Sequence, residues 1–256
     1  MPQVDWLIPD WPVPAGVHAV CTTRIGGVSR PPYDSLNLGD HVGDAAADVV
    51  VNRDRLRSAI GVRPVFLQQV HGTRVLALDD GVPDGAAADA CTSDRRGIAC
   101  TIMVADCLPV LFASARGTRV AAAHAGWRGL AGGVLEETLR SLRAPDAPDA
   151  PGDAPPIAWL GPCIGPRAFE VGDEVKAAFE AQAPEAGTCF QPTGAPGKWW
   201  ADLPGLARQR LRAAGVERIY GNDGSDAWCT VRSPLRFFSH RRDGVSGRFA
   251  ACVWLG

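Results

Sequence analysis

Three short stretches of this chain each place a metal-type ligand directly after an apolar, strand-like run. His71 and Cys107 follow such runs, and His124 closes another. Open sheets gather their ligand-binding groups at the carboxyl ends of strands. We therefore expect a fold in which three strand ends meet at one sheet edge, bringing two imidazoles and one thiolate together.

These three side chains allow two chemical interpretations. A structural zinc site is normally closed by four protein ligands, whereas a catalytic site has three and keeps one position open. His71, Cys107 and His124 would make a site of the second kind. Alternatively, Cys107 is a nucleophile with His71 or His124 as its base, which requires a thiol of lowered pKa. Metal content separates the two interpretations.

The hydrophobic pattern predicts an α/β (α+β) fold. Short apolar runs, mostly bounded by Gly, Pro or Asp, predict strands at 17–23, 64–70, 74–78, 98–104, 108–113, 119–123, 157–160, 216–220, 235–239 and 249–255. Apolar residues at helical spacing predict helices at 49–60, 130–143, 173–183 and 202–214, the last with Asp202 as its N-cap. Strands and helices alternate without a regular βαβ period, which indicates mixed β-sheets stacked between helices.

The chain is expected to form a single domain over residues 1–256. A Pro- and Ala-rich segment at 144–156 divides it, but the ligand candidates precede this segment and the arginine-rich motifs follow it. Such a density of proline prevents both helix and strand ladders. We therefore interpret 144–156 as an exposed loop inside that domain.

Composition excludes several classes of partner. The net charge of −2 provides no overall basic field for nucleic acid or an anionic membrane. No apolar run approaches the roughly 20 residues that span a bilayer. The N-terminal sequence lacks the features of a signal peptide, so we expect a cytoplasmic protein with its eight cysteines reduced.

Two further segments suggest anion binding. Residues 232–248 hold five arginines against one acid, a composition that suits a phosphate or carboxylate clamp or a solvated basic hairpin. Residues 22–27 combine hydroxyls, Arg24 and glycines, which suits either an anion-cradling loop or a plain turn.

Taken together, these motifs resemble the YfiH family, also called the laccase-domain or multicopper polyphenol oxidase family. The resemblance rests on QVHGT around His71, ADCLP around Cys107, HAGWRG around His124, GPCIGP at 161–166 and FSHRR at 238–242. It extends over nearly the whole chain. It implies a four-layer α/β/β/α sandwich in which His71, Cys107 and His124 are the zinc ligands, with copper as the second candidate metal.

The chain also offers candidate substrate contacts. We predict that Arg24, Asn37, Arg241, Arg242 and Arg248 bind substrate. Asp106 is a candidate for orienting a ligand from outside the coordination sphere.

Members of the family are described as polyphenol oxidases, as purine nucleoside phosphorylases that also deaminate adenosine, and as editing factors of peptidoglycan precursors. We favour phosphorolysis of adenosine, inosine and guanosine with adenosine deamination as a side reaction, because zinc and several arginines suit a purine nucleoside and phosphate. One alternative is an amidase that edits peptidoglycan precursors, which would use the same zinc and arginines on a nucleotide-linked peptide.

A copper oxidase and a non-enzymatic module would each place different demands on the ligands. A laccase-like copper oxidase is disfavoured because the chain has five histidines and no His-x-His pair. A non-enzymatic metal-binding interaction module requires a closed site, with Cys163 or Cys229 as the fourth ligand.

Overall fold

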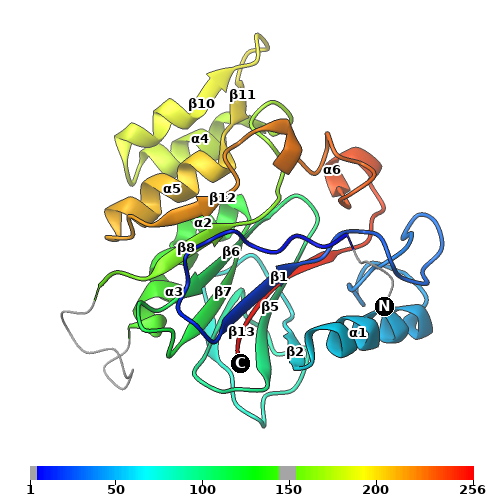
Figure 1. Ribbon diagram of the computed structural model, residues 1–256. Coiled ribbons are helices and arrows are strands. Elements are labelled where there is room, and N and C mark those ends of the chain that lie inside the picture. Colours follow the sequence, from blue (N-terminus) through cyan, green and yellow to red (C-terminus); the bar gives the residue numbers. More distant parts are fainter. Residues whose placement is uncertain (1–4, 144–153) are drawn as a thin grey trace.

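The structure is a computed structural model, in which residues 5–143 and 154–256 are described. Two β-sheets stack face to face, and helices cover both outer faces (Figure 1). The prediction of mixed sheets between helices is thereby confirmed. Most of the predicted loop at 144–156 lies outside the described residues.

The first sheet has four strands in the order β1 (Val17–Cys21), β13 (Phe249–Leu255), β5 (Ile98–Val104) and β2 (Arg63–Phe66). Strands β2 and β5 are parallel, and the other neighbours are antiparallel. Helix α1 (Ala46–Ile60) lies on the outer face of this sheet (Figure 1).

The second sheet has six strands. Their order is β12 (Ile219–Gly221), β8 (Ile157–Leu160), β6 (Leu108–Ala113), β7 (Val120–Ala125), β4 (Ala90–Ser93) and β3 (Val75–Ala77). The outer pairs β12–β8 and β4–β3 are parallel, and the central strands are antiparallel. Its outer face is covered by α2 (Trp127–Gly132), α3 (Val134–Leu142) and α5 (Leu203–Ala213).

The alternation of side chains along β5 and β6 defines the layers, because successive residues of a strand point to opposite faces. In β5, Ile98, Cys100, Ile102 and Val104 belong to the core between the two sheets, whereas Ala99 and Met103 pack in the cluster that contains Leu56 of α1. In β6, Leu111 faces the other sheet, and Val110 and Phe112 face the helices. Both strands are buried on both faces, which explains their unbroken apolar sequences.

A smaller antiparallel sheet extends beyond the four layers. It contains β10 (Phe190–Pro192), β11 (Lys198–Ala201) and β9 (Glu170–Gly172). Helix α4 (Asp173–Glu180) and the 3₁₀ turn η1 (Pro184–Cys189) pack against it, at the upper left of Figure 1. The C-terminal segment adds the short turn η2 (Asp226–Trp228) and α6 (His240–Asp243) before β13.

The structure corrects several predicted elements. The helix expected at 130–143 is two helices, because Gly133 adopts a φ of 99° that ends α2. The strand expected at 235–239 is a turn, since the Phe237 N–H donates back to the Ser233 carbonyl at 3.0 Å. By contrast, α5 begins as predicted, with the Asp202 carboxylate accepting the Gly205 N–H at 2.9 Å.

The strand expected at 64–70 stops at Phe66. Beyond it, the Gln69 amide takes over the pairing: it donates to the Met103 carbonyl and accepts the Met103 N–H, both at 2.8 Å. Strand β4 and the small sheet of β9, β10 and β11 were not predicted, because their strands are short and carry no regular alternation.

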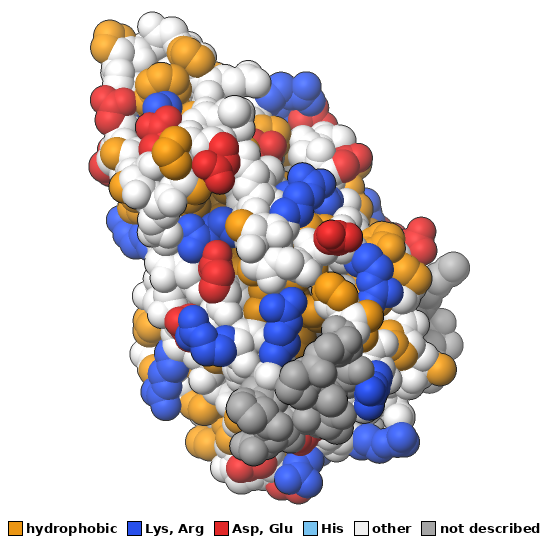
Figure 2. All heavy atoms as spheres, turned by 90° about the vertical axis from the view of Figure 1, so that its left-hand side faces the viewer, with side chains coloured by type: hydrophobic (Ala, Val, Ile, Leu, Met, Phe, Trp, Pro, Cys, Tyr) orange, Lys and Arg blue, Asp and Glu red, His pale blue; other side chains and the backbone are white. Residues whose placement is uncertain are grey.

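The outer surface over α2, α3 and α5, the helices that cover the six-stranded sheet, carries charges of both signs. Figure 2 shows basic and acidic side chains interspersed there, with hydrophobic side chains in small separate groups. Among the described residues, no helix combines the length and the apolar character that a membrane span requires.

The break at Gly133 gives a first prediction. Replacing it with alanine forces an L-residue into φ 99°, so we expect the free energy of unfolding to fall by about 1–2 kcal/mol. The control is Gly81→Ala, at an exposed glycine of ordinary φ whose added Cβ meets only an Asp79 oxygen at 3.4 Å. Equal urea midpoints for the two variants would contradict this explanation.

Candidate metal centre

The three ligand candidates lie together. The ligand atoms of His71, Cys107 and His124 are all within 4.8 Å of one another. The Cys107 Sγ is 3.7 Å from the His71 Nε2, and the two imidazole rings meet edge to face with their centroids 4.8 Å apart.

They do not come from one sheet edge, as the sequence suggested. His71 lies in the loop after β2 of the first sheet, whereas His124 lies inside β7 of the second. Cys107 lies in the tight turn that carries the chain from β5 of the first sheet to β6 of the second. The group therefore bridges the two stacked sheets.

A buried carboxylate, Asp89, holds both histidines. Its Oδ1 accepts the His71 N–H at 2.8 Å and contacts the His124 Nδ1 at 2.9 Å. Its Oδ2 accepts the Gly72 N–H at 2.7 Å and the Val70 N–H at 3.2 Å. The His71 loop and the His124 ring are thus fixed by the same side chain, and the Nε2 of His124 is left for a metal.

Asp106, predicted to orient a metal ligand, makes its side-chain hydrogen bonds to the C-terminal segment instead. Its Oδ1 accepts the Thr230 hydroxyl and its Oδ2 accepts the Arg241 N–H, each at 2.6 Å. It therefore ties the C-terminal segment to the turn that carries Cys107, while Asp89 contacts His124. Asp106 itself adopts a φ of 96°, in which an L-residue is strained, and strained residues of this kind cluster at functional sites.

The space around the ligands requires a glycine. A Cβ added to Gly126 would lie 2.9 Å from the Cys107 Sγ and 2.9 Å from the His71 Cδ2. Both contacts are too close for any side chain. The backbone before α2 can therefore approach the ligand group only with glycine at this position.

The ligand set fits zinc. Zinc–sulfur and zinc–nitrogen bonds in a tetrahedron place S and N roughly 3.5 Å apart, close to the 3.7 Å between Cys107 and His71. Cys163 and Cys229 are not part of the group: the Cys163 Sγ accepts from Asn222 at 3.4 Å and the Cys229 Sγ accepts the Gly165 N–H at 3.2 Å. Among the described residues the group has three protein ligands, the number of a site with an open position.

Cys107 and His124 stabilise each other's charged forms. Burial alone would raise the pKa of the Cys107 thiol, but the charge of His124 and hydrogen bonds from both histidines lower it to about 6. Burial alone would lower the pKa of His124, but the Cys107 thiolate and the Asp89 carboxylate raise it to about 9. A thiolate–imidazolium pair is therefore the stable state near neutral pH without metal.

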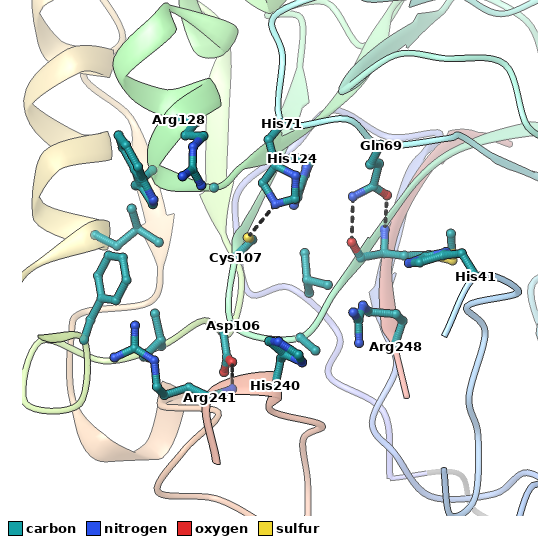
Figure 3. Close-up of a pocket in the computed structure, with 18 residues that line it drawn as sticks. His41, Gln69, His71, Asp106, Cys107, His124, Arg128, His240, Arg241 and Arg248 are labelled. Atoms are coloured by element: carbon teal, nitrogen blue, oxygen red, sulfur yellow. Dashed lines mark hydrogen bonds between the residues drawn. The ribbon is translucent and has the colours of Figure 1, made fainter. Parts of the chain in front are cut away.

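The group opens into a pocket of about 380 Å³ (Figure 3). The pocket is lined by His41, Gln69, His71, Met103, Val104, Ala105, Asp106, Cys107, His124, Gly126, Trp127, Arg128, Ile164, Phe169, Leu203, His240, Arg241 and Arg248. Three arginines face one carboxylate, and both oxygens of that carboxylate are already engaged. The lining therefore favours an anionic ligand.

The structure divides the predicted substrate contacts. Arg241 and Arg248 line the pocket, whereas Arg24, Asn37 and Arg242 do not. Arg24 lies over the ring of Phe238 and pairs with Asp34 at 3.1 Å.

The other two residues away from the pocket hold backbone in place. The Arg242 guanidinium donates to the carbonyls of Thr230 and Phe237 at 2.7 and 3.2 Å. The Asn37 Oδ1 accepts the Arg248 N–H at 2.8 Å, so Asn37 supports a pocket residue from behind.

Sequence reasoning missed Asp89, Arg128, His41 and Phe169. Asp89 had one visible signal, a lone carboxylate in an alanine-rich stretch that leads into a buried strand. A buried carboxylate needs strong partners, and that requirement points to a site.

The chain resembles known proteins over nearly its whole length. A family model described as multi-copper polyphenol oxidoreductase laccase matches residues 18–256. An Escherichia coli protein named purine nucleoside phosphorylase YfiH is 51% identical over 253 residues, which cover 97% of this chain and 98% of that protein. This chain belongs to the YfiH family.

Other relatives place it in the same family. A Pseudomonas aeruginosa protein, also named purine nucleoside phosphorylase, is 53% identical over 250 residues, which are 98% of each chain. A Neisseria meningitidis crystal structure superposes with a TM-score of 0.90 at 46% identity, covering 98% of this YfiH-family chain and 99% of the other. The YlmD structure from Geobacillus stearothermophilus gives 0.88 at 33% identity, covering 100% and 97%.

The role of Asp89 gives a second prediction. Asp89→Asn leaves the shape but removes the charge that holds two histidines, so zinc affinity should fall about 10–100-fold. Competition with a chromogenic chelator measures it. The control is Asp106→Asn, because that carboxylate binds Thr230 and the Arg241 backbone instead of a histidine. A larger loss in the control than in Asp89→Asn would contradict the assignment.

The coupled pKa values give a third prediction. His124 has a pKa of about 9, so near neutral pH it carries a proton that a metal must displace. Cys107 has a pKa of about 6, so near neutral pH its thiol has already lost its proton. Between pH of about 7 and about 8, zinc binding should release about one proton from this pair, and affinity should rise with pH. Calorimetry in buffers of different ionisation enthalpy measures the release. Affinity that falls with rising pH would contradict the charge assignment.

Proposed function

We propose that this chain is a metal-dependent purine nucleoside phosphorylase with a small-molecule substrate. The observation that carries the proposal is a three-ligand group that opens into a pocket with three arginines and an apolar wall. The names of relatives that align over nearly the whole chain support the same reaction class.

His71, Cys107 and His124 would hold zinc, with copper as the other candidate. When bound, the metal supplies a Lewis acid that withdraws electrons from an oxygen of the substrate. Among the described residues there is one such ligand group, whereas a multicopper oxidase needs ligands for several ions. A single-copper site often adds a weak axial methionine; Met103 lines the pocket but packs in the cluster under α1.

In the proposed reaction a phosphate oxygen forms a bond to C1′ of the nucleoside ribose. The bond from C1′ to the base breaks, the base leaves with the electron pair, and it takes up a proton. An arginine of the pocket would neutralise and position the phosphate. A pocket of about 380 Å³ matches a ligand of nucleoside size.

Deamination of adenosine is the proposed side reaction, in which water replaces the amine at C6 and ammonia leaves. A pocket that binds adenosine beside a Lewis-acid site provides for both reactions. The chain lacks the H-x-E and P-C-x-x-C signature of zinc nucleobase deaminases. Ammonia release in phosphate-free buffer distinguishes the side reaction from phosphorolysis.

An amidase acting on a nucleotide-linked peptide is the second candidate. The observation in its favour is that Arg128 and Arg248 lie on opposite sides of Cys107 (Figure 3). A substrate with phosphates at one end and a carboxylate at the other would satisfy both. The pocket would enclose only part of such a molecule.

The ligand assignment gives a fourth prediction. Cys107→Ala should reduce the rate of ribose-1-phosphate formation from inosine and phosphate by more than about 100-fold, because it removes one of three metal ligands. The control is Cys189→Ala, at a half-buried cysteine outside the pocket. Undiminished turnover in a zinc-free Cys107→Ala protein would refute the mechanism.

The reaction class is tested by offering zinc-loaded protein inosine, adenosine, a serine-containing peptidoglycan precursor and a phenol in parallel. We expect phosphate-dependent turnover of the nucleosides. Efficient turnover of the precursor alone, or of the phenol alone, would overturn the proposed function.

A further inference from the structure

The two sides of the pocket carry different kinds of side chain, and this difference suggests where each substrate of the proposed reaction binds. In Figure 3, Arg248, His41 and Gln69 lie on one side of Cys107, and Arg128 and Arg241 lie on the other. We call the first side, with Met103, the Arg248 half.

The other side combines two arginines with apolar side chains. Arg128 stacks on Trp127 at 4.4 Å, and the Arg241 guanidinium lies over the Phe169 ring at 5.6 Å, so both rings belong to this side. Ile164 and Leu203 pack in the same core cluster as Phe169. We call Phe169, Trp127, Ile164 and Leu203 the Phe169 half.

Arg248 is held in place by hydrogen bonds that leave two nitrogens of its guanidinium for a ligand. Its Nη1 donates to the carbonyls of Ser246 and Gly247 at 2.8 and 3.1 Å. Its backbone N–H donates to Asn37, and its Cγ lies 2.8 Å from where a Cβ on Gly39 would be. Its Nε and Nη2 make no hydrogen bond to any residue that the structure describes.

The other two arginines of the pocket are less suited to holding a phosphate. Arg241 is held in the same way as Arg248, with its Nη1 on the carbonyls of Ala168 and Glu170 at 3.5 and 3.2 Å, but its side chain is exposed. Arg128 is exposed and has only its stacking contact within the described chain. A guanidinium that is partly buried and already fixed, as in Arg248, attracts an anion more strongly and loses less entropy on binding.

We propose that the Arg248 half binds the phosphate co-substrate, through Nε and Nη2 of Arg248 with His41 beside it, and that the Phe169 half binds the purine base. This assignment rests on the proposed function. Two parallel N–H donors match two phosphate oxygens, the strong bidentate arrangement for this pair.

The division agrees with the chemistry of the reaction. Phosphate approaches C1′ from the side opposite the departing base, so the anion and the base need separate places with the ribose between them. The two halves lie on opposite sides of Cys107, which puts the ribose beside the ligand group. Packing against an apolar, aromatic wall stabilises the bound planar base. A cation that is already held in place stabilises the bound phosphate.

The test measures the KM of each substrate separately in zinc-loaded variants. Arg248→Met should raise the KM for phosphate about 10–100-fold, the loss of a charge-assisted hydrogen-bond pair, with little change in the KM for inosine. Arg128→Met is the matched control and should leave the KM for phosphate unchanged. Phe169→Leu should raise the KM for inosine and leave that for phosphate. A rise in the phosphate KM with Arg128→Met and not with Arg248→Met would overturn the assignment.

Two further measurements separate this assignment from the proposed function. Arg248→Lys keeps the charge without the fork and should lie between the wild type and Arg248→Met; it also replaces Arg248→Met where that variant does not fold. If the wild type forms no ribose-1-phosphate, the proposed function fails, and calorimetric titration with inorganic phosphate then decides the assignment. Weaker binding to Arg248→Met supports it, and equal binding, or none to the wild type, contradicts it.

Discussion

The buried carboxylate of Asp89 is the interaction on which the site depends. Burial raises the pKa of this group, but the hydrogen bonds from His124 and from the Gly72 and His71 N–H groups outweigh burial and lower it. The charge is stable only because the loop after β2 turns its N–H groups inward and β7 brings an imidazole alongside. If the carboxylate were lost, these groups would be left without their acceptor.

The location of the ligands follows from the stacked sheets. His71 lies in the loop after a strand of the first sheet, His124 lies in a strand of the second, and Cys107 lies in the turn that connects the two sheets. The core between the sheets is apolar, and the pocket opens at the ligand group that bridges them. Phe169 and Leu203, from the core cluster that the helices cover, then close one side of the pocket.

The elements whose positions depend on local sequence pattern could be predicted from the sequence. Strands β5, β6, β8 and β13 and the start of α5 at Asp202 follow from apolar runs, and their bounds were predicted. Contacts between distant segments were not visible. The sequence predicted Asn37 as a substrate contact, but it could not show the hydrogen bond between Asn37 and Arg248, which are 211 positions apart. Asp89 was missed for the same reason, since its importance comes from partners on other elements.

The proposed chemistry requires a metal centre with three protein ligands and one open position facing the pocket. The most direct measurement is a crystal structure of the zinc-loaded protein with anomalous data collected at the zinc edge. We predict one strong peak bonded to His71, Cys107 and His124, with a solvent or ligand atom in the fourth position. A peak closed by a fourth protein side chain, or located away from these three residues, would contradict this chemistry.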